Sequence, residues 1–235
     1  MTSSLASRSG ASGLAPAPPL DPARDALFLD LDGTLVDIAE RPELIRADEA
    51  LRTLLRGVGN RLAGRLVVVT GRPLVDIDRH LRDAVPLAAG IHGAELRGVP
   101  ARAVDPLLER ALARARQTLR EEEGGPLLQG ILVEDKGAAI ALHFRQHPAR
   151  GAAAGWLAAQ IAAGSEGLLA VQPGRMVVEL KPQGADKGRA LASFLAAPGF
   201  AGARPVFVGD DLTDEAGFIA AAAAGGPGGP VGGRL

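Results

Sequence analysis

Carboxylates, a hydroxyl group and a lysine stand where apolar segments of this sequence end or where a helix is expected to begin. The run "LFLDLDGT" contains Asp30 and Asp32, "VVVTGR" reaches Thr70, and "VFVGDD" reaches Asp210. Lys187 opens a predicted helix in "GADKG". In an open parallel sheet, ligands bind beyond the carboxyl ends of the strands. We therefore expect these side chains to converge at one edge of a sheet.

The residue types favour phosphoryl transfer at a metal ion. Asp30 and Asp32 are two residues apart and can face the same side. Converging carboxylates repel one another unless a cation is bound, and an all-oxygen set with open positions suits Mg²⁺. One aspartate can attack phosphorus and form an aspartyl-phosphate, and a second can protonate the leaving oxygen. Lys187 and the Thr70 hydroxyl can bind the phosphate.

Each of these residues also has an ordinary structural alternative. An aspartate in a turn often serves as a cap, and a lone lysine is usually solvated. Four such segments, each at a strand end or a helix start, are harder to explain as turn chemistry. Asp37, close behind the first segment, has nothing near it in the sequence that indicates more than a solvated charge.

The composition limits the classes of partner. The 235 residues carry a net charge of −1, with no cysteine, no tyrosine and 3% aromatic residues. Disulfides and thiolate metal sites are excluded, no apolar run approaches the ~20 residues of a membrane span, and stacking platforms for nucleic acid are missing. We expect a cytoplasmic protein, monomeric, that binds a small-molecule substrate and has no nucleic-acid or membrane partner.

The spacing of apolar residues predicts an α/β fold with a doubly wound, Rossmann-like parallel sheet. Continuous apolar strands alternate with helical patterns in residues 21–100 and 183–235, as in sheets buried on both faces. Strands are expected within residues 25–32, 64–72, 85–96 and 204–211, and helices within 47–62, 72–84, 185–197 and 213–224. Residues 1–20 are expected to form a flexible tail without a secretory signal. The Gly/Pro-rich residues 225–235 are expected to be irregular, which would leave an exposed sheet edge.

Residues 101–182 have a different pattern and predict an inserted α+β cap domain. The order is α-β-β-α-β-β, with hairpin turns at "EDKG" (134–137) and "QPGR" (172–175). The helix within residues 148–164 is expected to place Trp156 and Ile161 on its apolar side. Hinges between the two domains are expected near residues 98–101 and 181–184, where the composition changes.

The four chemical segments resemble the motifs of the haloacid dehalogenase superfamily of phosphatases. The resemblance implies Asp30 as nucleophile, Asp32 as general acid/base, Thr70 as a phosphoryl-binding residue and Lys187 as a stabilising cation. It further implies an Mg²⁺ site formed by Asp30, the Asp32 carbonyl and Asp210. Acidic residues after the fourth strand assist, and Asp211 and then Asp214 are the candidates.

A narrower resemblance is to the trehalose-6-phosphate phosphatase family. It rests on "GDDLTDE", "GIHGAEL" and "VEDKGAAIALHFR" and extends from Asp25 to Phe218. It implies hydrolysis of trehalose 6-phosphate to trehalose and phosphate. By position, the cap residues that bind the distal glucose are Glu134, Lys136 and Glu179. The other expected substrate-binding residues are Thr70, Gly71, Arg72, His92 and Glu95.

Alternatives to this function remain within the sequence. A phosphatase of the same superfamily that acts on another sugar phosphate would keep the core motifs and differ in the cap. A catalytically silent sugar-phosphate-binding protein would be expected to lose the nucleophile or a metal carboxylate, and Asp30 and Asp210 are both present. Two features differ from the family pattern: a threonine stands at position 70 where serine is more common, and the C-terminal segment has little strand-forming material. The first keeps the hydroxyl, and the second concerns stability more than chemistry.

Overall fold

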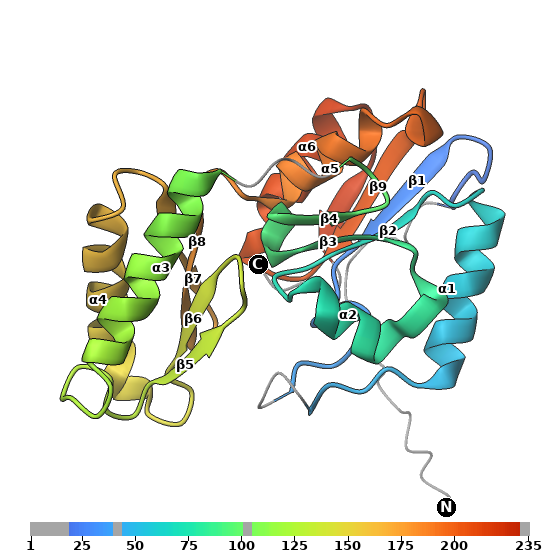
Figure 1. The fold of residues 1–235 in the computed structure, drawn as a ribbon. Helices are drawn as coiled ribbons and strands as arrows, with labels where there is room; N and C mark the ends of the chain where they lie inside the picture. The colour runs from blue at the N-terminus through green and yellow to red at the C-terminus, as the bar shows by residue number, and fades with distance from the viewer. Residues whose placement is uncertain (1–18, 40–43, 101–104, 231–235) are drawn as a thin grey trace, which may run out of the picture.

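The larger of two lobes is built on a six-stranded sheet (Figure 1). In the computed structural model, which describes residues 19–39, 44–100 and 105–230, the strand order is β10-β9-β1-β2-β3-β4. All neighbouring pairs are parallel except β3 and β4. The strands are β1 (Asp25–Leu29), β2 (Leu66–Val69), β3 (Leu87–Gly90), β4 (Glu95–Arg97), β9 (Arg204–Gly209) and β10 (Gly228–Pro230). β1 therefore lies inside the sheet, between β2 and β9.

Helices cover both faces of this sheet, which explains why its strands are continuously apolar. Leu27 and Leu29 of β1 pack in the same core cluster as Leu55, whereas Phe28 points to the other face and meets Phe194 at 6.2 Å between ring centroids. The helices on the first face are α1 (Glu49–Arg61) and α2 (Leu74–Leu81), and those on the second are α5 (Lys187–Leu195) and α6 (Glu215–Ala223). The predicted doubly wound α/β core is confirmed.

The smaller lobe, called the cap from here on, stands beside the core (Figure 1). It is a four-stranded antiparallel sheet in the order β5-β6-β8-β7, with two helices packed on one face. Its elements are α3 (Pro106–Glu121), β5 (Leu132–Asp135), β6 (Ile140–His143), α4 (Gly151–Ala163), β7 (Leu169–Gly174) and β8 (Val177–Pro182). Residues 101–104, where the cap was expected to begin, and residues 1–18 of the expected tail lie outside the described residues.

Three helices begin at an aspartate whose side chain accepts a backbone N–H of the first turn. Asp48 opens α1, Asp105 opens α3, and Asp186 opens α5 by accepting the N–H of Arg189 at 2.7 Å. Such caps satisfy donors that have no partner within the helix. The hydrogen bond of Asp186 at the start of α5 places Lys187 as the first residue of this helix, beside the carboxyl edge of the sheet.

The C-terminal segment departs from the expectation of an irregular tail. β10 runs parallel to β9, with Gly228 opposite Phe207 and Pro230 opposite Gly209. The N–H of Gly226 donates to the carbonyl of Ala221 at 2.9 Å and directs the chain from α6 toward the sheet. Backbone pairing needs no side chain, so low strand propensity did not prevent it. The outer edge of β9 is therefore covered.

Other departures are local. Trp156 is 54% exposed, because Leu157 and Ala158 occupy the buried side of α4, while Ile161 packs partly against the cap core. The β7–β8 turn lies beyond Gly174 rather than at residues 172–175. No helix in the described part of the chain has the length and apolar character needed to span a membrane.

Candidate active site

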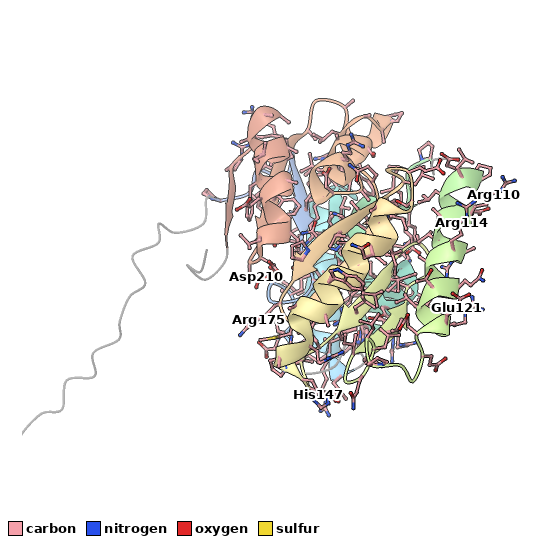
Figure 2. The ribbon with its side chains drawn as sticks, turned by 90° about the vertical axis from the view of Figure 1, so that its left-hand side faces the viewer. Arg110, Arg114, Glu121, His147, Arg175 and Asp210 are labelled. Carbon is pink, nitrogen blue, oxygen red and sulfur yellow. The ribbon has the colours of Figure 1, made fainter. Side chains whose placement is uncertain are left out.

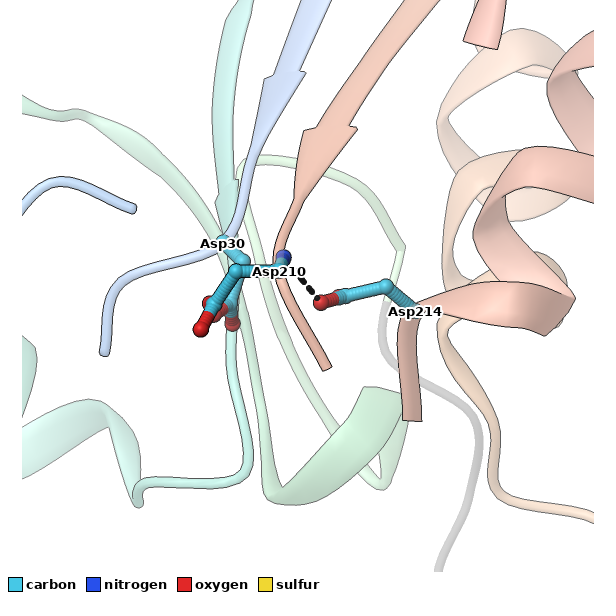
Figure 3. Close-up of side chains that lie close together, drawn as sticks. All are labelled: Asp30, Asp210 and Asp214. Carbon is cyan, nitrogen blue, oxygen red and sulfur yellow. Dashed lines mark hydrogen bonds between the residues drawn. The ribbon is translucent and has the colours of Figure 1, made fainter. Parts of the chain in front are cut away.

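Three aspartates, two directly after adjacent strands and one in the turn that follows the second, lie together at the carboxyl edge of the core sheet (Figure 3). β1 and β9 are in register, with Leu29 opposite Val208, so Asp30 and Asp210 leave the sheet side by side. The N–H of Asp30 donates to the carbonyl of Val208 at 2.9 Å. Asp214 ends the 3₁₀ turn that follows, and one carboxylate oxygen from each aspartate lies within 4.8 Å of the others. These oxygens can share one cation.

Lys187 lies between two of these carboxylates. Its Nζ is 2.6 Å from Asp30 Oδ1 and 2.6 Å from Asp214 Oδ1, and all three side chains are buried. Burial alone would lower the pKa of Lys187, but the charges of Asp30 and Asp214 outweigh it and raise that pKa. The ammonium therefore stays charged and holds Asp30 in place.

The cluster has more negative charge than one ammonium can balance. Burial raises the pKa of Asp30 to about 7, with Lys187 opposing the shift and Asp214 adding to it. Burial and the charge of Asp214 also raise the pKa of Asp210. A donor set of carboxylate oxygens that resists ionisation in this way fits a hard divalent cation such as Mg²⁺. The Asp30, Asp210 and Asp214 carboxylates are the residues that would hold it.

Asp214, rather than Asp211, belongs to this group. Its second oxygen accepts the N–H groups of Asp210 at 3.0 Å and Asp211 at 2.9 Å, which fixes the carboxylate within the turn. Asp211 instead serves as the N-terminal partner of a capping box, its side chain accepting the N–H of Asp214. Gly209 precedes them because any Cβ there would collide with the Asp214 carboxylate. The expected precedence of Asp211 over Asp214 therefore does not match the geometry.

The "DGT" turn after β1 brings two further groups to the cluster. Gly33 has a φ of +88°, and any Cβ there would collide with the carboxylate of Asp210. Only glycine meets both conditions. The turn lets the Thr34 hydroxyl donate to Asp210 Oδ1 at 3.3 Å. The sequence analysis did not identify Thr34 as a site residue, although it belongs to the "DGT" segment.

Asp32, the expected acid/base, is held by an arginine. Arg72 Nε and Nη2 each lie 2.7 Å from a different oxygen of Asp32, a bidentate pair that fixes both planes. Arg72 Nη1 also lies 3.6 Å from Asp76 Oδ2, and the backbone N–H of Arg72 donates to the hydroxyl of Thr70 at 3.2 Å. Thr70 and Arg72 thus tie the loop after β2 to the first motif.

The cap reaches this loop through Glu179 and Lys136. Glu179 Oε2 lies 3.0 Å from His92 Nε2, and its other oxygen pairs with Lys136. Lys136 Nζ also donates to the carbonyl of Gly71 at 3.2 Å. A Cβ at Gly71 would come within 2.7 Å of His92 Nε2, so glycine leaves the room that the histidine occupies. These four residues join cap and core, and we call them the cap–core contact.

Burial shapes the charges of the cap–core contact. Burial opposes ionisation of Glu179, but the hydrogen bond with His92 and the charge of Lys136 outweigh it and lower the pKa to about 2. The pKa of His92 is lowered, mainly by burial and in spite of Glu179. His92 also has the left-handed backbone, with a φ of 53°, that non-glycine residues rarely adopt outside constrained sites.

Two expected substrate-binding residues make other contacts. Glu134 pairs with His143 at 2.7 Å on the cap sheet, and its charge acts on Arg72, which places it near the core. Glu95 Oε2 accepts the N–H of Leu74 at 2.7 Å. That bond caps the start of α2, where Pro73 supplies no side-chain cap.

Comparison with solved structures identifies the fold. The C-terminal domain of trehalose-6-phosphate phosphatase from Candida albicans superposes with a TM-score of 0.69 at 20% identity, over 86% of this chain and 79% of that chain. Phosphatases of the haloacid dehalogenase superfamily share the arrangement. At these identities the likeness shows the fold alone.

Sequence comparison shows the family to which this chain belongs. The trehalose-phosphatase family model matches residues 28–224. A probable trehalose-phosphate phosphatase of Sinorhizobium fredii is 41% identical over 195 residues, covering 82% of this chain and 72% of that protein. The trehalose-6-phosphate phosphatase of Escherichia coli is 36% identical over 201 residues, covering 83% and 73%. The chain belongs to the trehalose-phosphatase family and is a phosphatase.

Proposed function

We propose that this protein hydrolyses trehalose 6-phosphate to trehalose and inorganic phosphate, with Mg²⁺ held by Asp30, Asp210 and Asp214. The observation that supports the chemistry most directly is the buried Lys187, which lies 2.6 Å from both Asp30 and Asp214 at the carboxyl edge of the sheet. The two trehalose-phosphate phosphatases that are 41% and 36% identical to this chain support trehalose 6-phosphate as the substrate. A cytoplasmic location and a monomeric state stay predictions.

The proposed reaction proceeds through two displacements at phosphorus. A carboxylate oxygen of Asp30 forms a bond to phosphorus as the bond from phosphorus to the sugar oxygen breaks, and Asp32 gives its proton to that oxygen. Asp32 then takes a proton from water, which attacks the aspartyl-phosphate, releases phosphate and restores Asp30. When bound, Mg²⁺ supplies positive charge that stabilises the phosphoryl oxygens. Thr70 donates to those oxygens, and Arg72 orients Asp32.

The cap supplies the proposed recognition of the second sugar. Glu134 on β5 and Glu179 on β8, the two strands that flank β6, present carboxylates, and Lys136 in the turn after β5 presents an ammonium. Fixed donors and acceptors of this kind select hydroxyl groups, because an analogue that lacks them leaves buried polar groups unpaired. His92 and Gly71 contribute from the core side.

Phosphate release from a panel of sugar phosphates, with and without Mg²⁺, tests this proposal. The wild type is expected to prefer trehalose 6-phosphate and to need Mg²⁺. Asp30→Asn is expected to lose activity by at least about 10³-fold, as when a nucleophile is removed. Arg175 is exposed at the surface of the cap (Figure 2), and Arg175→Met serves as the control for expression and folding. Undiminished activity of Asp30→Asn, or no turnover of trehalose 6-phosphate, would contradict the proposal.

The alternative of another sugar phosphate is separated by cap variants. Lys136→Met and Glu179→Gln are expected to raise KM for trehalose 6-phosphate far more than KM for p-nitrophenyl phosphate, which has no second sugar. Equal changes for both esters would indicate a different substrate.

A further inference from the structure

Lys181 is a buried cation on the face of the cap sheet that meets the core. It belongs to β8, where Val178 and Leu180 point into the cap core beside α3 and α4. Alternate residues of a strand point to opposite faces. Glu179 and Lys181 therefore share the other face, and Glu179 contacts His92 of the core there. Lys181 lies two residues, or about 7 Å, further along the strand toward α5.

The ammonium of Lys181 has no partner among the described residues. The side chain belongs to a residue that is 7% exposed, yet it makes no hydrogen bond or ion pair within that part of the chain. Across all the described residues, the side-chain polar atoms that are sealed from solvent and have no partner are His80 Nε2, Arg97 Nε and Arg150 Nε. Lys181 Nζ is not one of them, so it keeps an opening to solvent. A buried ammonium without a counter-ion is costly, and the expected remedy is an anion.

The nearby carboxylates are already committed. Asp186 and Glu179 are the acidic groups whose charges act on Lys181, and Lys187 is the nearby cation. The Asp186 side chain caps α5 by accepting the N–H of Arg189, and Glu179 is held by His92 and Lys136. Lys187 is likewise neutralised by Asp30 and Asp214. Of these two lysines, Lys181 alone has its charge uncompensated within the described residues.

We propose that Lys181 is a substrate-binding residue that contacts the phosphoryl group from the cap side. The assignment rests on the proposed function of the same site. In that site the phosphorus of the sugar phosphate is at Asp30 and the distal sugar is at Glu179. Lys181 is near both ends of such a sugar phosphate, because the charge of Lys187, the partner of Asp30, acts on it and its own charge acts on His92, the partner of Glu179. A dianionic phosphate compensates the ammonium, whereas a sugar hydroxyl would leave its charge unbalanced. The cap then contributes to binding the phosphate as well as the sugar.

The test compares Lys181→Met, which removes the charge and keeps an unbranched chain, with Lys181→Arg and the control Arg175→Met. Lys181→Met is expected to raise KM for trehalose 6-phosphate and the inhibition constant of inorganic phosphate by about 10–100-fold, the range for a hydrogen bond to a charged group. The inhibition constant of trehalose is expected to stay within about twofold. Lys181→Arg should recover part of the loss, because it restores the charge. The melting temperature of Lys181→Met should not fall, since no protein contact is removed.

Each contrary outcome is specific. Unchanged constants for both inhibitors, or a rise for trehalose alone, would overturn the assignment, and so would a lower melting temperature without a change in phosphate inhibition. If the wild type hydrolyses a different sugar phosphate, the proposed function fails, and the same phosphate inhibition measured with that substrate still decides the role of Lys181. If no ester is hydrolysed, calorimetric binding of inorganic phosphate with Mg²⁺ present decides it.

Discussion

At the scale of single residues, the carboxylates of this site fall into two groups: those that gather around a possible cation site and those that accept backbone N–H groups. Asp30, Asp210 and Asp214 surround one point, and Lys187 compensates part of their charge. Asp211 follows Asp210 directly but is not part of this cluster, and its side chain accepts the N–H of Asp214 in the 3₁₀ turn. Sequence adjacency therefore says little about which acidic residue reaches the ion.

Asp214→Asn and Asp211→Asn are expected to differ sharply. Asp214 is fully buried, and its substitution weakens the ion pair with Lys187, which keeps Asp30 as its counter-ion, so the free energy of unfolding should fall by about 1–3 kcal/mol. The Mg²⁺ concentration for half-maximal activity should also rise. Asp211→Asn keeps a capping side chain, so its stability should change by less than about 1 kcal/mol. Denaturant titrations and Mg²⁺ titrations of both variants measure these effects. A larger Mg²⁺ effect in Asp211→Asn would restore the sequence-based order.

The motif residues could be predicted from sequence because their local settings repeat a simple arrangement, a carboxylate or hydroxyl directly after an apolar strand. Asp30, Thr70 and Asp210 are placed in this way by parallel strands. The choice between Asp211 and Asp214 could not be predicted, because it depends on how the turn after β9 closes. Lys181 carried a weak signal in "VVELKP", where the period of two puts it on the same face as Glu179.

At the scale of elements, short connections after the strands matter more than the strands themselves. Residues 85–96 were expected to form one strand and a loop, whereas the structure has β3, a 3₁₀ turn and β4 returning antiparallel. The return places Glu95 against the first turn of α2. Sequence periodicity cannot indicate such a return, because a strand of three residues gives too few positions to count.

Glu95→Ala is expected to act on stability and not on substrate affinity. The substitution removes the acceptor for the N–H of Leu74, and loss of a helix cap costs about 1 kcal/mol. KM for trehalose 6-phosphate should stay near the wild-type value, in contrast to Glu179→Gln. Thermal unfolding and steady-state kinetics of the two variants separate these roles. A large rise in KM with unchanged stability would return Glu95 to the substrate-binding set.

At the scale of the whole molecule, the cap and the core are joined by residues that are themselves expected to bind substrate. Lys136 and Glu179 contact Gly71 and His92 across the two lobes. Substrate must therefore share or replace these bonds when it binds. The change in pattern near residues 101 and 182 predicts an inserted domain, and these boundaries stay a prediction beside the second, four-stranded sheet of the structure. The pairing of individual side chains across the lobes could not, because it depends on how the cap is oriented.

The cap–core contact predicts a pH dependence of stability. Because the pKa of His92 is lowered from 6.5 in the folded protein, unfolded chains bind more protons as the pH falls below that value. The stabilisation is complete above about pH 6.5 and is lost as the pH falls toward the lowered folded pKa. Glu179, with a pKa near 2, adds its own loss only below about pH 4.5. The His92 contribution to the free energy of unfolding should therefore decrease from pH 7 to pH 5, whereas Asp30, whose pKa is raised to about 7, contributes in the opposite direction.

His92→Asn isolates that contribution. Asparagine tolerates the left-handed backbone and does not titrate in this range. In urea unfolding, the stability of the wild type relative to this variant should fall from pH 7 to pH 5, because Asp30 and His80, whose pKa is also lowered by burial, contribute equally to both proteins. An identical slope in both proteins would mean that His92 titrates normally.

The pairing of β10 with β9 has a consequence for how the molecule behaves in a crowded solution. A sheet edge with free N–H groups is a template on which other chains can add strands and begin to aggregate. Among the described residues the strand at this edge is Gly228–Pro230, and Pro230 has no N–H to offer. Glycine and proline also add little to any intermolecular strand pairing. The segment that looks least like a strand thus ends the sheet with a poor site for self-association.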